Sequence, residues 1–164
     1  RDRSVSRGLG DVYKRQVRDM LEHSARQKGL TLKLDIRGKL PQAVSGDPTR
    51  LRQVLVNLAG NAVKFTEHGS VTIAAEAVQQ DENGVTIAFA IADTGIGIPE
   101  ESIAHIFERF YRVDKSHSRE IGGTGLGLAI ARSAIVMHRG AIRVYSKENE
   151  GTTFSVRIPL NYVM

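Results

Sequence analysis

Four polar side chains recur at helical spacing after Asp47-Pro48 and could together bind a metal-bound phosphate group; they are Gln53, Asn57, Asn61 and Lys64. At about 100° per residue they share one stripe, which lies beside an apolar stripe of the same helix. Amide oxygens are hard ligands that suit Mg2+, and an ammonium group pairs with phosphate. A solvated polar face explains the pattern about as well, although asparagine is unfavourable inside a helix and two occur here.

A second candidate site follows an apolar strand, in the segment Asp93-Thr94-Gly95-Ile96-Gly97-Ile98-Pro99. The carboxylate of Asp93 could accept a hydrogen bond from the exocyclic amine of adenine. Gly95 and Gly97 would let a planar ligand approach the backbone closely. The alternative is an ordinary turn followed by a helix that begins at Pro99.

A third candidate site is the glycine-rich run Gly122-Gly123-Thr124-Gly125-Leu126-Gly127, which leads into a predicted helix. Free amides at a helix N-terminus bind phosphate, and glycines allow the phosphates to come near. The run does not fit a dinucleotide-binding fingerprint, because polar residues precede it and no acidic residue follows about 20 positions later. It is not a Walker loop either, since no Gly-Lys-Ser/Thr follows.

The spacing of apolar residues and the turn-forming residues between the segments predict one α+β domain, in which helices pack on one face of a mixed sheet. Helices are predicted over 17–29, from Pro48 to about 65, briefly after Pro99, and over 126–137; strands over 30–36, 71–78, 85–92, 142–146 and 153–158. The first helix is predicted to bury Val17, Met20, Leu21 and Ala25. The last is predicted to bury Leu126, Ala129, Ile130, Ser133, Ala134 and Met137. Residues 112–124 are polar and predict a mobile loop.

Composition indicates one domain of 164 residues with an adequate core, since 41% of residues are hydrophobic and 25% are charged. The absence of cysteine excludes disulfides and thiolate metal sites. No apolar run approaches the ~18 residues that span a bilayer, and no secretory leader is recognisable, so we expect a cytoplasmic domain. Of the net charge of +5, residues 1–16 supply three units, so we expect no nucleic-acid partner.

Residues 1–16 differ from the rest, and we expect them not to be native. Residues 6–16 match the in-frame translation of a transposon-based sequencing adaptor, whose final codons GAT GTG TAT AAG AGA CAG encode Asp11 to Gln16. A natural basic linker is the alternative, since its glycines suit a flexible segment. On the adaptor hypothesis the natural protein continues upstream, the domain is 17–160, and 161–164 form a tail.

In their order along the chain, the motifs resemble the four ATP-site motifs of sensor histidine kinases. They are Asn57–Thr66, Asp93–Pro99, Ile106–Arg112 and Gly123–Leu128. Gly151-Thr152-Thr153-Phe154 resembles the last strand of that family. The resemblance covers about residues 17–160. It implies the Bergerat-type fold shared with the DNA gyrase B subunit and a heat-shock chaperone, a two-layer sandwich with a mixed, mostly antiparallel sheet.

The resemblance also implies roles for individual residues toward ATP and Mg2+. At the phosphates, Asn61 would hold the magnesium ion, and the residues facing the phosphates would be Gln53, Asn57 and Lys64. At the base, Asp93 would bind the adenine amino group, and Gly95, Gly97 and Ile98 would shape the pocket. The remaining positions are the aromatic motif and lid residues Phe107, Phe110 and Arg112, the glycine motif Gly123, Thr124, Gly125, Leu126 and Gly127, and Thr152.

The implied activity is that of a protein-histidine kinase whose acceptor histidine lies elsewhere. None of the five histidines stands in a pattern like His-Glu-Leu-Arg-Thr-Pro, so we expect little or no phosphotransfer by this chain alone. The expected partners are the dimerisation and phosphotransfer helices of the same parent protein and a response regulator receiver domain. We expect this chain to be monomeric and the parent to be a homodimer anchored in the membrane.

Two other functions remain open on the sequence. One is ATP hydrolysis, as in a chaperone or topoisomerase module. Such enzymes use an acid to activate water, and the amide Gln53 at that helical position argues against it. The other is a nucleotide-binding module that regulates without chemistry, against which the intact motifs argue.

Overall fold

The computed structural model describes residues 17–38, 44–45, 48–109 and 127–162. The predictions for residues 1–16, Phe110, Arg112, the loop 112–124 and residues 123–126 therefore lie outside the described part of the chain. In chain order the elements are α2 (Arg18–Gln27), β1 (Thr31–Arg37), β2 (Val44–Ser45), α3 (Pro48–Phe65), β3 (Ser70–Gln80), β4 (Gly84–Asp93), α4 (Glu100–Ile103), α6 (Gly127–Met137), β5 (Ala141–Lys147) and β6 (Gly151–Tyr162).

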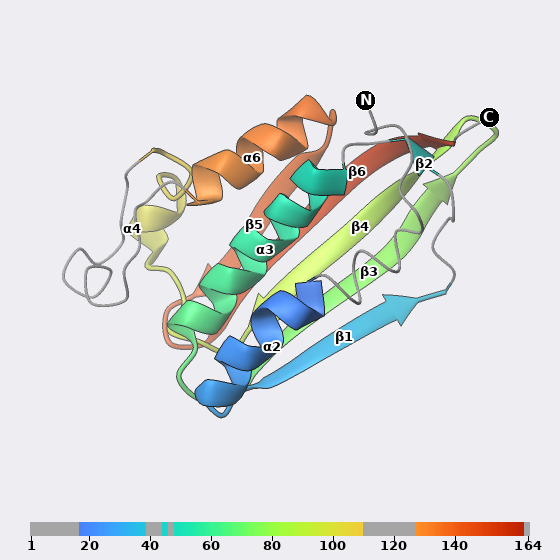
Figure 1. Ribbon diagram of the computed structural model, residues 1–164. Helices are drawn as coiled ribbons and strands as arrows, with labels where there is room; N and C mark the ends of the chain where they lie inside the picture. The colour runs from blue at the N-terminus through green and yellow to red at the C-terminus, as the bar shows by residue number, and fades with distance from the viewer. Residues whose placement is uncertain (1–16, 39–43, 46–47, 110–126, 163–164) are drawn as a thin grey trace.

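The strands form one sheet in the order β1-β3-β4-β6, with β5 and β2 both paired to the outer edge of β6 (Figure 1). β5 pairs with residues 151–157 of β6, and the short β2 pairs with Asn161 and Tyr162. Only the β1–β3 pair is parallel among the described strand pairs. This sheet confirms the predicted α+β class with a mixed, mostly antiparallel sheet. β6 continues into the first two residues of the predicted tail.

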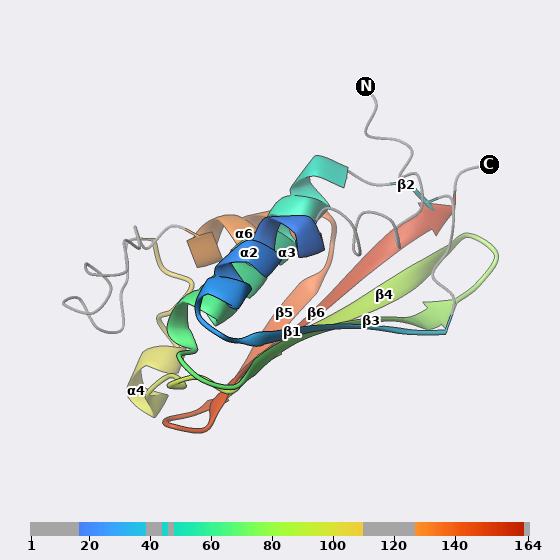
Figure 2. The same cartoon turned by 60° about the horizontal axis from the view of Figure 1, so that its bottom comes forward.

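Strand alternation determines which face of the sheet the helices cover. In β4, Val85, Ile87, Phe89 and Ile91 are buried, while the residues between them are partly exposed. The buried side chains meet α3, whose Leu51, Val54, Leu55 and Leu58 are almost fully buried. Helices α2, α3 and α6 lie on one side of the sheet, and no described helix lies on the other (Figure 2). The result is the predicted two-layer sandwich.

The apolar stripe predicted for α6 is wrong at Ile130, Ser133 and Met137, which are exposed, although Ala134 is buried as predicted. Ala131, Ala134 and Ile135 are buried, whereas Ile130 is 41% and Met137 63% exposed. Nearly every residue of α6 is apolar, so helical spacing alone does not select a face. Two alanines on the inner face let α6 lie close to α3, with which it packs.

In α2 the prediction for Met20 is also wrong. This side chain is 54% exposed, while Val17, Leu21 and Ala25 are buried as predicted. The three buried positions follow helical spacing and meet the core, and Met20 lies outside that narrow stripe. The helix ends as predicted, because Gly29 has φ +74°.

Candidate functional site

A row of three polar residues crosses the end of the sheet at which β4 finishes. Asp93 pairs with Thr152 on β6, and Thr152 pairs with Ser146 on β5. Asp93 follows the buried Ile91 by two residues, and Thr152 precedes the buried Phe154 by two. Because side chains alternate along a strand, the row lies on the helix-covered face. Residues more than 50 positions apart in the sequence thus become neighbours.

Among the three residues of this row, Asp93 has a carboxyl group whose pKa is shifted by its surroundings. Burial raises the pKa of its carboxyl above the ordinary value of 3.8. Hydrogen bonds from the backbone N–H groups of Gly95 and Thr152 oppose that rise in pKa, and the closeness of the Thr66 hydroxyl opposes it too. The Gly95 N–H donates to Oδ1 at 2.8 Å. A partly desolvated carboxylate of this kind gains from a ligand that donates a hydrogen bond to it.

Thr66 is a buried residue whose role the sequence did not reveal. Its side chain is fully buried, and Oγ1 has no hydrogen-bond partner in the described structure. A Cβ placed on Gly95 would lie 2.8 Å from this oxygen and 3.0 Å from Asp93 Oδ1. The hydroxyl therefore lies beside the carboxylate, close enough to lower its pKa without a hydrogen bond of good geometry. Unpaired buried hydroxyls are uncommon and often mark functional sites.

The glycine loop after Asp93 is fastened to the hairpin between β5 and β6. Gly97 has φ +75°, and a Cβ on it would collide with the carbonyl of Lys147. The Asn149 N–H donates to the Ile96 carbonyl at 2.7 Å. The Ile98 N–H donates to Ser146 Oγ at 2.8 Å. The loop thus needs glycine at position 97 both for its φ value and for close contact with the hairpin.

Asn57, one residue of the polar stripe of α3, lies beside the start of α6. Asn57 Nδ2 donates to the Gly127 carbonyl at 3.3 Å, which joins the first and last predicted motifs. Asn57, Asn61 and Lys64 are partly buried, whereas Gln53 is exposed. The hydrogen bond therefore places Asn57 at the N-terminal end of α6, where backbone amides favour anions.

Phe107 anchors the aromatic motif to the sheet. Its ring meets Phe154 of β6 edge to face, with centroids 6.3 Å apart and planes at 73°. The neighbouring Ile106 is buried. This contact joins the segment after α4 to the strand that carries Thr152.

Sequence reasoning missed Ser146 as well as Thr66. Ser146 follows Ile142 and Val144 at the period of two, so it is a polar residue at an inward position of a strand. That pattern was a usable signal, but its meaning depends on the pairing of β5 with β6. Ser146 Oγ contacts the Gly151 carbonyl at 3.0 Å and Thr152 Oγ1 at 2.7 Å.

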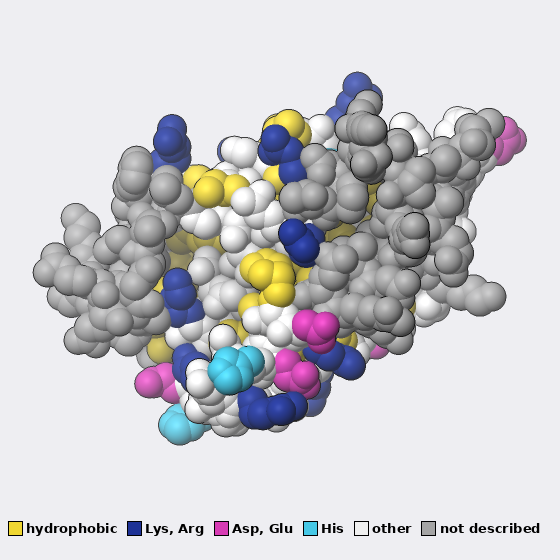
Figure 3. All heavy atoms as spheres, in the orientation of Figure 1, with side chains coloured by type: hydrophobic (Ala, Val, Ile, Leu, Met, Phe, Trp, Pro, Cys, Tyr) yellow, Lys and Arg dark blue, Asp and Glu magenta, His cyan; other side chains and the backbone are white. Residues whose placement is uncertain are grey.

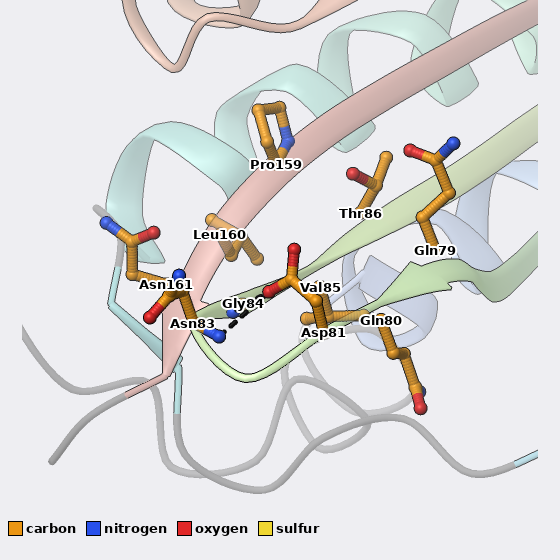
Figure 4. A pocket seen from close by; sticks show the side chains of 10 residues that line it. All are labelled: Gln79, Gln80, Asp81, Asn83, Gly84, Val85, Thr86, Pro159, Leu160 and Asn161. Carbon is orange, nitrogen blue, oxygen red and sulfur yellow. Dashed lines mark hydrogen bonds between the residues drawn. The ribbon is translucent and has the colours of Figure 1, made fainter.

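An open hollow of about 510 Å³ lies at the opposite end of β4 (Figure 4). It is lined by the β3–β4 turn and the end of β6, and includes none of the predicted site residues. The carboxylate of Asp81 in its wall already accepts from the N–H groups of Asn83 at 2.8 Å and Gly84 at 3.0 Å. Because its lining contains none of Asp93, Thr152 and Ser146, the hollow is separate from the Asp93 row.

The sandwich, the desolvated acid at the end of a strand, the glycine loop and the amide stripe define a nucleotide-binding domain of the α+β class. A family model described as "Histidine kinase-, DNA gyrase B-, and HSP90-like ATPase" matches residues 46–162. The chain belongs to this family, as a catalytic ATP-binding domain of the histidine kinase type.

Known proteins agree with this assignment. Signal transduction histidine-protein kinase BarA of Escherichia coli (strain K12) is 44% identical over 146 residues, which are 89% of this chain and 16% of BarA. Circadian input-output histidine kinase CikA of Synechococcus elongatus is 40% identical over 146 residues, 88% of this chain and 19% of CikA. The chain thus spans less than a fifth of the length of these relatives.

Solved structures support the same fold. The catalytic domain of histidine kinase ThkA has a TM-score of 0.76 and 30% identity, covering 93% of this chain and 92% of that one. Full-length ShkA in complex with AMPPNP has a TM-score of 0.82 and 33% identity, covering 99% of this chain and 32% of ShkA.

Proposed function

We propose that this domain binds Mg-ATP and transfers the γ-phosphoryl group to a histidine on a dimerisation helix outside the described residues. The observation that most supports the proposal is the desolvated carboxylate of Asp93 beside the buried Thr66 hydroxyl, which has no hydrogen-bond partner within the described part of the chain. The α3 amide stripe beside the start of α6 supports a phosphate site on the same helix-covered face.

At the base end, the side chains suit adenine by their chemistry. The Asp93 carboxylate accepts a hydrogen bond from the exocyclic amine, which compensates the charge that burial disfavours. The Thr66 hydroxyl supplies a second polar group, which has no hydrogen-bond partner among the described residues. The glycine loop, fixed by Ser146 and Asn149, brings backbone close to a flat ligand.

At the phosphate end, Asn61 would hold the magnesium ion, with Asn57, Gln53 and Lys64 toward the phosphates. The described residues contain no cluster of three His, Cys, Asp or Glu side chains. Mg2+ commonly takes one or two protein ligands and completes its shell with phosphate oxygens and water, so a single amide fits it. Bound magnesium supplies charge neutralisation, while Lys64 and backbone amides position the triphosphate.

In the proposed reaction a neutral imidazole nitrogen forms a bond to the γ-phosphorus. The bond between that phosphorus and the β–γ bridging oxygen breaks, ADP leaves, and the other ring nitrogen loses its proton to solvent. Two described histidines already have partners: His105 Nδ1 lies 2.7 Å from a Glu108 oxygen, and His138 Nδ1 lies 2.9 Å from the Ala134 carbonyl. Gln53 cannot accept a proton from water, which disfavours hydrolysis.

The wider assembly is part of the same proposal. The partners would be the dimerisation and phosphotransfer helices of the parent and a receiver domain, with the parent a membrane-anchored homodimer. No helix among the described residues could cross a bilayer. On the described part of the helix-covered face, basic side chains are scattered rather than gathered (Figure 3), which supports the proposal that nucleic acid is not a partner.

The test titrates the chain with a fluorescent ATP analogue, with and without Mg2+, and adds ADP or GTP as competitors. A separate helical hairpin that carries an acceptor histidine is then supplied, and its phosphorylation is followed. We expect Mg-dependent binding and transfer, both lost in Asn61→Ala. The matched control Asn161→Ala changes an exposed amide at the far end of the sheet. Unchanged phosphotransfer in Asn61→Ala would contradict the magnesium assignment, and binding without transfer would indicate a regulatory module.

A further inference from the structure

We propose that Ser146 is a positioning residue that makes the Thr152 hydroxyl a hydrogen-bond acceptor toward the base, and thereby selects adenine over guanine. This inference rests on the proposed nucleotide site. Ser146 is partly buried on β5 and lies next to Thr152, which lies next to Asp93. Its Oγ contacts two other segments: the glycine loop through Ile98, and β6 through Gly151 and Thr152.

The hydrogen-bond inventory of a hydroxyl determines the direction of each contact. A serine hydroxyl has one proton to donate and two lone pairs that accept. The Ile98 N–H at 2.8 Å can only donate, so Ser146 Oγ accepts from it. The Gly151 carbonyl at 3.0 Å can only accept, so Ser146 gives it the single hydroxyl proton.

After these two contacts, Ser146 Oγ has one lone pair left, which can accept one more hydrogen bond. Thr152 Oγ1 lies 2.7 Å away, and either hydroxyl could donate in this contact. Because we assign the Ser146 proton to the Gly151 carbonyl, the donor here is Thr152. Once that proton is used, Thr152 retains only lone pairs. The Thr152 hydroxyl is thus held as an acceptor before any ligand arrives.

An acceptor-only Thr152 extends the chemistry of its neighbour Asp93. The ionised carboxylate of Asp93 also only accepts. Two acceptors side by side suit the exocyclic amine of adenine, which has two N–H groups. The same two acceptors disfavour guanine, which carries a carbonyl oxygen where adenine carries the amine. That oxygen would face the lone pairs of Asp93 and Thr152 with no hydrogen between them. Without Ser146, the Thr152 hydroxyl is free to rotate and donate.

The test uses the full chain and measures the dissociation constants of ATP and GTP by competition with the fluorescent analogue. In Ser146→Ala we expect ATP to bind about tenfold more weakly, as for one lost hydrogen-bond network, and the preference for ATP over GTP to fall by a similar factor. Ser146→Thr keeps a hydroxyl at this position, so it should keep the preference for ATP over GTP that Ser146→Ala loses. Ser155→Ala on the opposite face of β6 is the matched control and should match the unaltered chain.

Thr152→Val provides a second, independent variant. It removes the hydroxyl that Ser146 orients, so the preference should fall in this variant too, and the double variant should lose little more. If Ser146→Ala weakened the binding of ATP and GTP equally, the preference for ATP would be intact. Ser146 would then have only a structural role, and the inference would be overturned. If the unaltered chain does not bind ATP, the proposed function itself fails, which is a distinguishable result.

Discussion

Replacing Asp93 by asparagine separates the stability of the domain from its function. Burial raises the pKa of this carboxyl above 3.8, so the folded protein holds the proton more tightly than the unfolded chain does. The ionised group therefore costs stability, and that cost grows as pH rises from 3.8 through the raised pKa. Asparagine keeps an oxygen that can accept from the Gly95 N–H, at 2.8 Å in the present structure. We expect Asp93→Asn to be at least as stable as the unaltered chain at pH 7.

The same change should remove much of the affinity for adenine nucleotides. A hydrogen bond to a charged acceptor contributes roughly 1.5–3 kcal/mol, and the amide would oppose the adenine amine with its own N–H groups. Since about 1.4 kcal/mol corresponds to a factor of ten, ATP should bind roughly 10- to 100-fold more weakly. Affinity is measured by titration with a fluorescent ATP analogue.

Urea unfolding at several pH values measures the stability side of this prediction. The gain in unfolding free energy of Asp93→Asn should be largest near pH 7 and should vanish as pH falls below 3.8, where both side chains are neutral. Asp35→Asn is the control, because Asp35 is exposed on β1 and pairs with Arg37 at 3.2 Å. A variant that binds ATP normally, or that loses ATP and GTP affinity equally, would refute the role of Asp93 at the base. A large loss of stability at pH 7 would refute the electrostatic argument.

Three further changes test contacts that stabilise the domain, two of them next to the site. Gly97→Ala should cost about 1–3 kcal/mol in urea unfolding and weaken ATP binding, because its φ is +75° and its Cβ would meet the carbonyl of Lys147; a stable variant with full affinity would contradict the bracing of the loop. Phe107→Leu should cost about 1 kcal/mol, since the edge-to-face contact with Phe154 is lost while most of the apolar volume is retained; an unchanged thermal midpoint would argue against that contact. Lys28→Met should cost about 1 kcal/mol without changing ATP affinity, because its ammonium donates to two carbonyls at the end of α3, at 2.7 and 2.9 Å; weaker nucleotide binding would contradict this separation.

Local pattern predicted the elements of this domain well, because the period of apolar residues is a property of the chain itself. Helix α3 and strands β3 and β4 follow clear periods of 3.6 and 2, and the structure contains all three close to the predicted ranges. Residue type and spacing were also enough to identify Asp93, Gly97 and Asn57 as candidates. Pattern failed in α6, where apolar residues surround the helix and the packing against α3 selects the inner face.

Residue type and near neighbours were enough to predict the described helices, every described strand except the short β2, and the order of the motifs. Which side chains share the site depends instead on how the strands pair in the folded domain. Register across three strands aligns Asp93, Thr152 and Ser146, and no local signal specifies the partner of a strand. Likewise, Thr66 gains its meaning only when burial leaves its hydroxyl beside the carboxylate. Hydrogen bonding and desolvation depend on these long-range contacts, so the electrostatics of the site belong to the folded chain.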